Sequence, residues 1–294
     1  MRICYSCVVD QGERFSWQCR LWVWSLTRLG KIAKDSLCVH LVGENPSLEA
    51  FLAAEGVKYL RVEAFGDGLY CNKLAQCESP LLQEADFIFL TDCDMAFLSS
   101  LDGCVTQDAC VGKIVDMPNP PLQLLRKVFS HYRVVEPPLA ETLTEKSFAN
   151  NFNGGLYGIP RKYFAVLGSF WKRFASDLLS SEEMRQTLGH FSKHIDQIAF
   201  CLAVNVAQIP TIALPLAYNF PLHIMKKVLE AKAGCVSPLS QDTVAKTDFS
   251  VLCLHYHSCT ENGLLQYTGN VSLDEKIAIV NALINEESAL RQDV

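Results

Sequence analysis

Two aspartates stand two residues apart directly after an apolar segment, and they carry the strongest chemical signal in the sequence. Asp92 and Asp94 follow the apolar segment 87–90, and Met95 and Phe97 resume the apolar pattern. Acidic side chains between two apolar segments are costly to bury unless they are paired or bound to a cation. Carboxylate oxygens suit Mn²⁺ and Mg²⁺, and such a cation neutralises a diphosphate. The pattern therefore predicts a Mn²⁺ or Mg²⁺ site that holds a diphosphate, with a turn of two solvated aspartates as the alternative.

Two histidines close a late apolar segment and offer further metal ligands. His255 and His257 are separated by one residue at the end of segment 251–256, which is typical of a strand. Alternate residues of a strand share one face, so we expect the two imidazoles to lie on the same side. Imidazole also suits Zn²⁺, although the 13 cysteines of the chain offer no evident completion of a zinc site.

Two further short motifs offer polar groups for a ligand. Asn153, Gly154 and Gly155 combine an amide for sugar hydroxyls with glycines that permit close backbone approach, and a simple bulge or turn is the alternative. Asp196 and Gln197 stand near the start of an apolar helical segment. They can present a carboxylate and an amide to a substrate, or Asp196 can merely complement the helix dipole.

The elements that must position these residues alternate along the first hundred residues. We expect strands at 2–9, 37–42, 57–62 and 87–90, and helices at 15–29, 48–55 and 72–79. Alternating strands and helices predict a parallel sheet covered on both faces. Ligands of such sheets bind outside the carboxyl ends of the strands. Asp92 and Asp94 fall at that place.

The rest of the chain is expected to complete one α/β domain. Predicted strands lie at 111–115, 209–214 and 251–256, and predicted helices at 122–129, 161–175, 181–190, 194–206 and 272–292. Segment 132–147 has little periodicity and is read as a mobile lid. Gly30 and Gly56 are expected to end two helices, and Ser47 to cap the second. We expect a domain at 1–260 and a helical extension packed on it at 261–294, its apolar positions closing the core or forming a dimer or membrane surface.

Composition excludes several classes of protein. The 294 residues include 26 basic and 32 acidic ones, giving a net charge of -6, and no basic stripe indicates a nucleic-acid partner. No apolar stretch reaches membrane-spanning length, and the first residues lack the apolar region of a signal peptide. The cysteines are expected to be buried in a reducing, cytoplasmic protein. Cys4 and Cys7 should point to opposite faces of their strand, which argues against a metal pair.

In order and spacing, these motifs resemble the GT-A nucleotide-sugar glycosyltransferases, particularly family 8, the enzymes similar to glycogenin and lipopolysaccharide galactosyltransferase. The resemblance spans roughly residues 1–260, and it rests on the segments 72–74, 86–94, 152–156, 196–197 and 255–257. It implies a mostly parallel, Rossmann-like sheet flanked by helices. It also implies transfer of a sugar from a nucleotide-diphosphate donor, expected to be a UDP-sugar, to a carbohydrate, lipid or protein hydroxyl.

The resemblance also implies roles for the metal ligands. Asp94 would bind the cation directly, and Asp92 would bind it too or contact the ribose. His255 would be the third protein ligand, and His257 would lie near the diphosphate.

Further roles follow from the same resemblance. Asp10 would hold the base, and Lys73 would contact the nucleotide. The segment 153–155 would line the sugar and acceptor side, and Asp196 and Gln197 would lie beside the reacting carbon.

The chain departs from the family 8 pattern at its C-terminal motif. That pattern continues from its histidine through a glycine to Lys-Pro-Trp, whereas here the segment 257–263 contains no such sequence. A diphosphate-binding lysine is therefore missing from its expected place, and a retaining or an inverting reaction stays open. In an inverting reaction Asp196 is the candidate general base. The rival interpretations are a nucleotidyltransferase and a non-catalytic nucleotide-sugar binding module.

Overall fold

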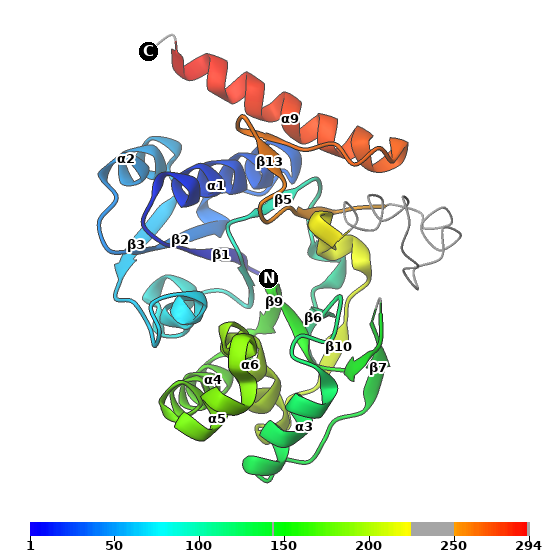
Figure 1. Cartoon of the computed structure of the whole chain (residues 1–294). Coiled ribbons are helices and arrows are strands. Elements are labelled where there is room, and N and C mark those ends of the chain that lie inside the picture. The colour runs from blue at the N-terminus through cyan, green and yellow to red at the C-terminus, as the bar shows by residue number, and fades with distance from the viewer. Residues whose placement is uncertain (143, 225–249, 293–294) are drawn as a thin grey trace.

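The computed structural model describes residues 1–142, 144–224 and 250–292, and its centre is a seven-stranded sheet (Figure 1). The strand order is β10-β6-β9-β4-β1-β2-β3. In chain order these strands are β1 Ile3–Val9, β2 Leu37–Val42, β3 Lys58–Val62, β4 Phe87–Thr91, β6 Cys110–Ile114, β9 Phe152–Pro160 and β10 Thr211–Ala213. Strands β1 to β4 pair in parallel, as the alternating pattern of the first hundred residues predicts. Strand β9 runs antiparallel to both β4 and β6, so the sheet is mostly parallel.

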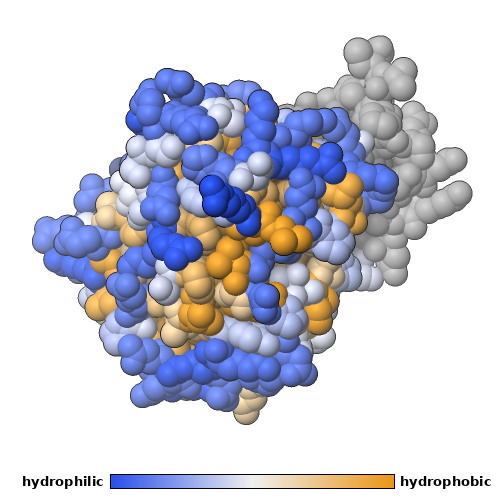
Figure 2. Space-filling view, turned by 90° about the horizontal axis from the view of Figure 1, so that it is seen from below, coloured by the Kyte–Doolittle hydropathy of each residue, from blue (hydrophilic) through white to orange (hydrophobic). Residues whose placement is uncertain are grey.

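Helices cover both faces of this sheet. The α-helices are α1 Glu13–Trp24, α2 Pro46–Glu55, α3 Leu122–His131, α4 Arg161–Ser180, α5 Glu182–Leu188, α6 Ile195–Val206 and α9 Val271–Gln292. Figure 1 places α1, α2 and α9 above the sheet and α3 to α6 below it. Seen from below, that lower layer presents apolar residues in the middle of its surface with polar residues around them (Figure 2).

Strand β1 shows how the sequence divides the core between the two faces. Cys4 belongs to the apolar cluster shared with α4 and α6, whereas Tyr5 and Cys7 belong to the cluster shared with α1 and α2. The two cysteines therefore point to opposite sides, as predicted from their spacing.

A second, three-stranded sheet joins distant parts of the chain. It consists of β11 Phe220–Pro221, β12 Cys253–His255 and β5 Met95–Phe97. Strand β12 pairs antiparallel with β5, so His255 lies opposite Met95. This pairing brings the late histidine segment to the residues that follow β4.

The C-terminal helix α9 packs on the body of the molecule. Leu273, Ile277, Val280 and Ile284 are buried in one cluster with residues of β11 and β12. Ile279 is also one of the apolar positions of this helix expected to close the core, but it is 45% exposed. Among the described residues, no helix is both long and apolar enough to cross a membrane.

Several local predictions were wrong in instructive ways. Asn45, rather than Ser47, caps α2, since its side chain accepts a hydrogen bond from the Leu48 amide and Pro46 begins the helix. Segment 72–79 is not an α-helix but a 3₁₀ helix, η3 Tyr70–Glu78. In segment 132–147, β7 Leu139–Glu141 pairs antiparallel with β8 Lys146–Phe148, which ends just beyond it, and the interpretation of the segment as a mobile lid stays a prediction.

Candidate active site

The backbone fixes the two aspartates at the junction of the large and the small sheet. The Asp92 amide donates to the Gly155 carbonyl at 3.0 Å, which ties the end of β4 to β9. The Asp94 carbonyl accepts from the Tyr256 amide at 3.1 Å, which ties the start of β5 to the end of β12. Both carboxylates therefore lie at the carboxyl edge of a central strand, as the sequence predicts.

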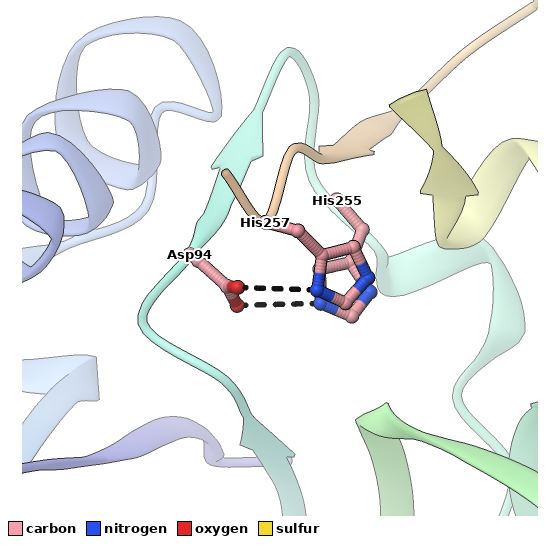
Figure 3. A group of neighbouring side chains, drawn as sticks. All are labelled: Asp94, His255 and His257. Carbon is pink, nitrogen blue, oxygen red and sulfur yellow. Dashed lines mark ion pairs between the residues drawn. The ribbon is translucent and has the colours of Figure 1, made fainter. Parts of the chain in front are cut away.

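Asp94, His255 and His257 point toward one another in this junction (Figure 3). The distance from Asp94 Oδ1 to His255 Nε2 is 3.2 Å, and that from Asp94 Oδ2 to His257 Nδ1 is 3.5 Å. The two imidazole rings stack with centroids 3.8 Å apart. The two imidazoles lie side by side, as predicted, but not because they share a strand face. Strand β12 ends at His255, and His257 has a φ of 49°. A left-handed turn, not strand alternation, brings the second ring over the first.

Burial and mutual contact shift the pKa values of the three residues. Burial alone would raise the pKa of Asp94, but His255 and His257 lower it below its usual value, so Asp94 is ionised. Burial works against a charged His255, yet Asp94 beside it raises the pKa of that imidazole. Burial and the neighbouring His255 lower the pKa of His257 to about 2, so His257 is neutral and carries a lone pair.

These three residues fit a bound divalent metal ion. Their ligand atoms all lie within 4.8 Å of one another. The Nε2 atom of His257 is buried and has no hydrogen-bond partner among the described residues, and His255 Nε2 is buried against the Asp94 carboxylate. Buried polar atoms without a partner are costly unless a ligand satisfies them. Asp92 stands at the border of the group, with Oδ2 3.9 Å from His255 Nε2.

Lys73 joins the two acidic motifs that the sequence leaves far apart. Its Nζ lies 2.7 Å from Asp92 Oδ1 and 3.6 Å from Asp196 Oδ2, and it donates to the Gly154 carbonyl. Lys73 is only 7% exposed. Burial alone would lower its pKa, but Asp92 and Asp196 raise it, so the ammonium is kept charged. The site therefore has a buried cation between the candidate metal centre and Asp196.

Asp196 is a buried acid with one unused oxygen. Its Oδ1 has no hydrogen-bond partner among the described residues, while its backbone carbonyl accepts from Trp171 Nε1 at 2.7 Å. Burial raises the pKa of Asp196 to about 6, although Lys73 opposes the shift. A carboxyl with a pKa near neutrality can exchange protons at physiological pH. Dipole compensation at the start of α6 does not account for this burial.

The glycines of β9 make room for the side chains of the site. A Cβ on Gly155 would lie 2.5 Å from His255 Cε1, and a Cβ on Gly154 would lie 3.1 Å from both Asp196 Oδ2 and Lys73 Nζ. The Gly154 amide donates to Gln197 Oε1 at 3.2 Å, which ties α6 to the strand. The predicted glycines thus lie in the site, where they allow protein side chains to approach.

A pocket of about 320 Å³ opens beside the aspartates. Asp10 lines it and accepts a hydrogen bond of 2.6 Å from Asn72 Nδ2. Lys73, Asp92, Asp94 and His257 line it as well. The pocket thus brings together Asp10, Lys73, Asp92, Asp94 and His257, whereas Asn153, Asp196 and Gln197 are not among the residues that line it.

Sequence reasoning missed two residues of this region. Arg14, in the first turn of α1, lines the pocket, and its guanidinium donates to the His257 carbonyl at 3.4 Å. Arg14 stands at the start of the helix after the first strand, close in sequence to Asp10, which was already expected to hold the base. This position was a signal that could have been used. Asn219 is fully buried, and its Oδ1 lies 3.0 Å from His255 Nδ1. No pattern in the sequence around it indicates this contact.

Comparison with known proteins relates the chain to others by its fold. No protein-family model matches the sequence, and no curated protein sequence does. The structure of the galactosyltransferase LgtC in complex with donor and acceptor sugar analogs has a TM-score of 0.54 and 13% identity, covering 93% of this chain and 94% of that one. The glycosyltransferase GlyE of Streptococcus pneumoniae has a TM-score of 0.56 and 13% identity, covering 99% of this chain and 64% of that one. The fold is therefore that of the GT-A glycosyltransferases, as the motifs predict.

Proposed function

We propose that this protein is a metal-dependent glycosyltransferase, which moves a sugar from a nucleotide-diphosphate donor to the hydroxyl of an acceptor. The observation that carries the proposal is the convergence of Asp94, His255 and His257 beside a pocket. The protein that holds this pocket has a fold similar to that of known glycosyltransferases. A bound cation there would neutralise the diphosphate as it leaves. Two imidazoles beside one carboxylate favour Mn²⁺ over Mg²⁺, because Mg²⁺ prefers oxygen ligands.

The pocket suggests how the donor lies. Asp10 and Asn72 line the pocket together, joined by a hydrogen bond, and would offer hydrogen bonds to the base and ribose. Asp92 and Asp94 also line the pocket, at the cation site, so the diphosphate would lie against them. We assign uridine as the base only by the resemblance to family 8, and a nucleotide screen decides it.

Arg14 takes the role of a diphosphate-binding cation in this proposal. Apart from His257, the basic residues that line the pocket are Arg14 and Lys73, and Lys73 is already paired with two aspartates. The Arg14 guanidinium lies beside the His257 carbonyl, close to the residues of the cation site. Arginine binds phosphate oxygens through charge-assisted hydrogen bonds. Arg14 thus supplies a positive charge that the missing Lys-Pro-Trp segment does not.

Asp196 and Gln197 form the sugar side of the proposed reaction. Asp196 Oδ1 is free to accept a hydrogen bond, and Lys73 holds Oδ2. If the reaction inverts the anomeric configuration, Asp196 is the candidate base for the acceptor hydroxyl. If the reaction retains that configuration, Asp196 and Gln197 support the positive charge that develops at the sugar. Determination of the anomeric configuration of the product distinguishes the two.

The test of this proposal is metal-dependent release of the nucleoside diphosphate. UDP-sugars are incubated with the protein with and without Mn²⁺, and UDP release is measured. We expect release that requires Mn²⁺ and is lost in Asp94→Ala, while the control Asp108→Ala, at an exposed residue that does not line the pocket, behaves as the native protein. Near-normal release by Asp94→Ala would refute the metal-site assignment. Tight binding of the donor with no turnover across many acceptors would favour the non-catalytic module instead, and release of pyrophosphate from a nucleoside triphosphate would favour a nucleotidyltransferase.

A further inference from the structure

A chain of buried amide groups leads from β9 to the His255 imidazole. Asn153 Oδ1 accepts from the Gly155 amide at 2.9 Å and from Asn219 Nδ2 at 3.1 Å. Asn219 Oδ1 in turn lies 3.0 Å from His255 Nδ1. Asn219 and His255 are almost completely buried, so water does not compete for these bonds.

The donor and acceptor roles along this chain follow from its first member. The Gly155 backbone amide can only donate, so the atom of Asn153 that faces it must be the oxygen. The atom of Asn219 that faces this oxygen must then be the nitrogen. Asn219 therefore turns its oxygen toward His255 Nδ1, and this nitrogen of the ring must carry the proton.

We propose that Asn219 is the positioning residue that fixes the tautomer and the ring orientation of His255 for metal binding. A neutral imidazole carries one proton, so a proton on Nδ1 leaves a lone pair on Nε2. His255 Nε2 is the atom that lies 3.2 Å from Asp94 Oδ1, on the side of the candidate cation site. Partners of this kind fix and strengthen histidine ligands, and their loss typically weakens metal binding by roughly 10- to 100-fold. The inference rests on the proposed metal centre.

The fold holds Asn219 where this role requires it. Asn219 follows the short 3₁₀ helix Leu216–Tyr218 and directly precedes β11. Strand β11 pairs in parallel with β12, with Pro221 opposite His255. At the other end of this row of hydrogen bonds, Asn153 Nδ2 donates to Asp116 Oδ2 at 3.5 Å. Asp116 in turn forms a buried ion pair with Lys113.

Three variants separate the acceptor function of Asn219 from its structural contribution. Asn219→Leu removes both hydrogen bonds, whereas Asn219→Asp keeps an acceptor for His255 and loses the donor to Asn153. The control is Asn281→Leu, because Asn281 is also buried and, among the described residues, its side chain bonds to the Leu265 backbone, away from His255. Mn²⁺ affinity is measured by electron paramagnetic resonance, together with thermal unfolding of each variant.

All three variants are expected to be less stable than the native protein, but only Asn219→Leu should lose Mn²⁺ affinity, by about 10-fold or more. Asn219→Asp and Asn281→Leu should bind Mn²⁺ within about threefold of the native protein, since both keep an acceptor for Nδ1. Native-like Mn²⁺ binding by Asn219→Leu, or an equal loss in all three variants, would overturn the inference.

Nitrogen NMR of the histidine rings tests the tautomer without any metal. His255 signals are identified by their absence in His255→Gln, and the neutral ring should carry its proton on Nδ1 in the native protein and in Asn219→Asp. Above the pKa of His255, a neutral ring with its proton on Nε2 and none on Nδ1 would contradict the assigned role of Asn219. If the native protein shows the expected tautomer but binds no Mn²⁺, the proposed metal centre fails while the hydrogen-bond assignment stands.

Discussion

At the scale of single residues, the site depends on the absence of a side chain at Gly155 as much as on the ligands themselves. A methyl group there would lie 2.5 Å from His255 Cε1 and 2.7 Å from its Nδ1. We expect Gly155→Ala to displace the imidazole and to weaken Mn²⁺ binding by about 10-fold or more, because a shifted ligand loses its geometry. Isothermal titration calorimetry with Mn²⁺ measures this. The control is Gly103→Ala, whose methyl group would meet only the Tyr218 hydroxyl at 3.3 Å; equal Mn²⁺ affinity of both variants would rule out this role of Gly155.

Asp196 predicts the pH dependence of the reaction. Burial raises the pKa of Asp196 to about 6, so the carboxylate form required by either mechanism appears as the pH rises through that value. At saturating Mn²⁺, kcat/KM should therefore increase with pH and level off above about pH 7. The Asp196→Asn variant should be slow and should lack this increase. A native profile that is flat from about pH 5 to about pH 8 would remove Asp196 from the reaction.

Two features of the site could not be predicted from the sequence, for one physical reason. The missing side chains of Gly154 and Gly155 make room for Asp196, Lys73 and His255, which come from other elements, while the role of both glycines at the sugar stays a prediction. Asn219 was missed for the same reason, since its partner His255 is 36 residues away. Spacing along the chain identifies groups near one strand end, but it carries no information about which distant side chain fills the space beside them.

At the scale of elements, the first turn of α1 carries a prediction for Arg14. Hydrogen bonds to charged groups contribute roughly 1.5–3 kcal/mol, so we expect Arg14→Gln to raise the KM for the donor by about 10-fold or more. The kcat should change less than KM, because Arg14 lines the pocket whereas Asp196 is not among the residues that line it. Steady-state kinetics with varied donor concentration measures both. Lys58→Gln on the exposed strand β3 is the control, and an unchanged KM in Arg14→Gln would exclude Arg14 from donor binding.

The elements themselves were predictable where the local pattern was strong. The apolar segment before Asp92 forms β4, and its position between β1 and β9 puts both aspartates at a ligand-binding edge. The turn at His257 was not predictable, because a positive φ in a non-glycine residue depends on tertiary contacts. The 3₁₀ geometry of η3 was not predictable either, because in so short a segment the spacing of apolar residues does not distinguish a 3₁₀ helix from an α-helix.

At the scale of the whole molecule, helix α9 closes an apolar cluster above the small sheet that carries His255. Ile277 is fully buried in that cluster, so we expect Ile277→Ala to lower the free energy of unfolding by about 2–5 kcal/mol. Ile279 lies on the same helix but is 45% exposed, and Ile279→Ala should change this free energy by less than about 0.5 kcal/mol. Chemical denaturation of both variants gives the comparison. Equal destabilisation by the two substitutions would contradict the packing of α9.

The central claim is that the Asp94, His255 and His257 group binds a cation that the nucleoside diphosphate shares. The most direct measurement is thermal unfolding of the native protein with UDP, GDP or ADP, each with and without Mn²⁺. A ligand that binds only the folded state stabilises it, by about 2.7 kcal/mol at a concentration 100 times its Kd. We predict a large rise in Tm for one diphosphate, only when Mn²⁺ is present, and no such rise in Asp94→Ala. A rise that is the same without Mn²⁺, or the same in Asp94→Ala, would contradict the account.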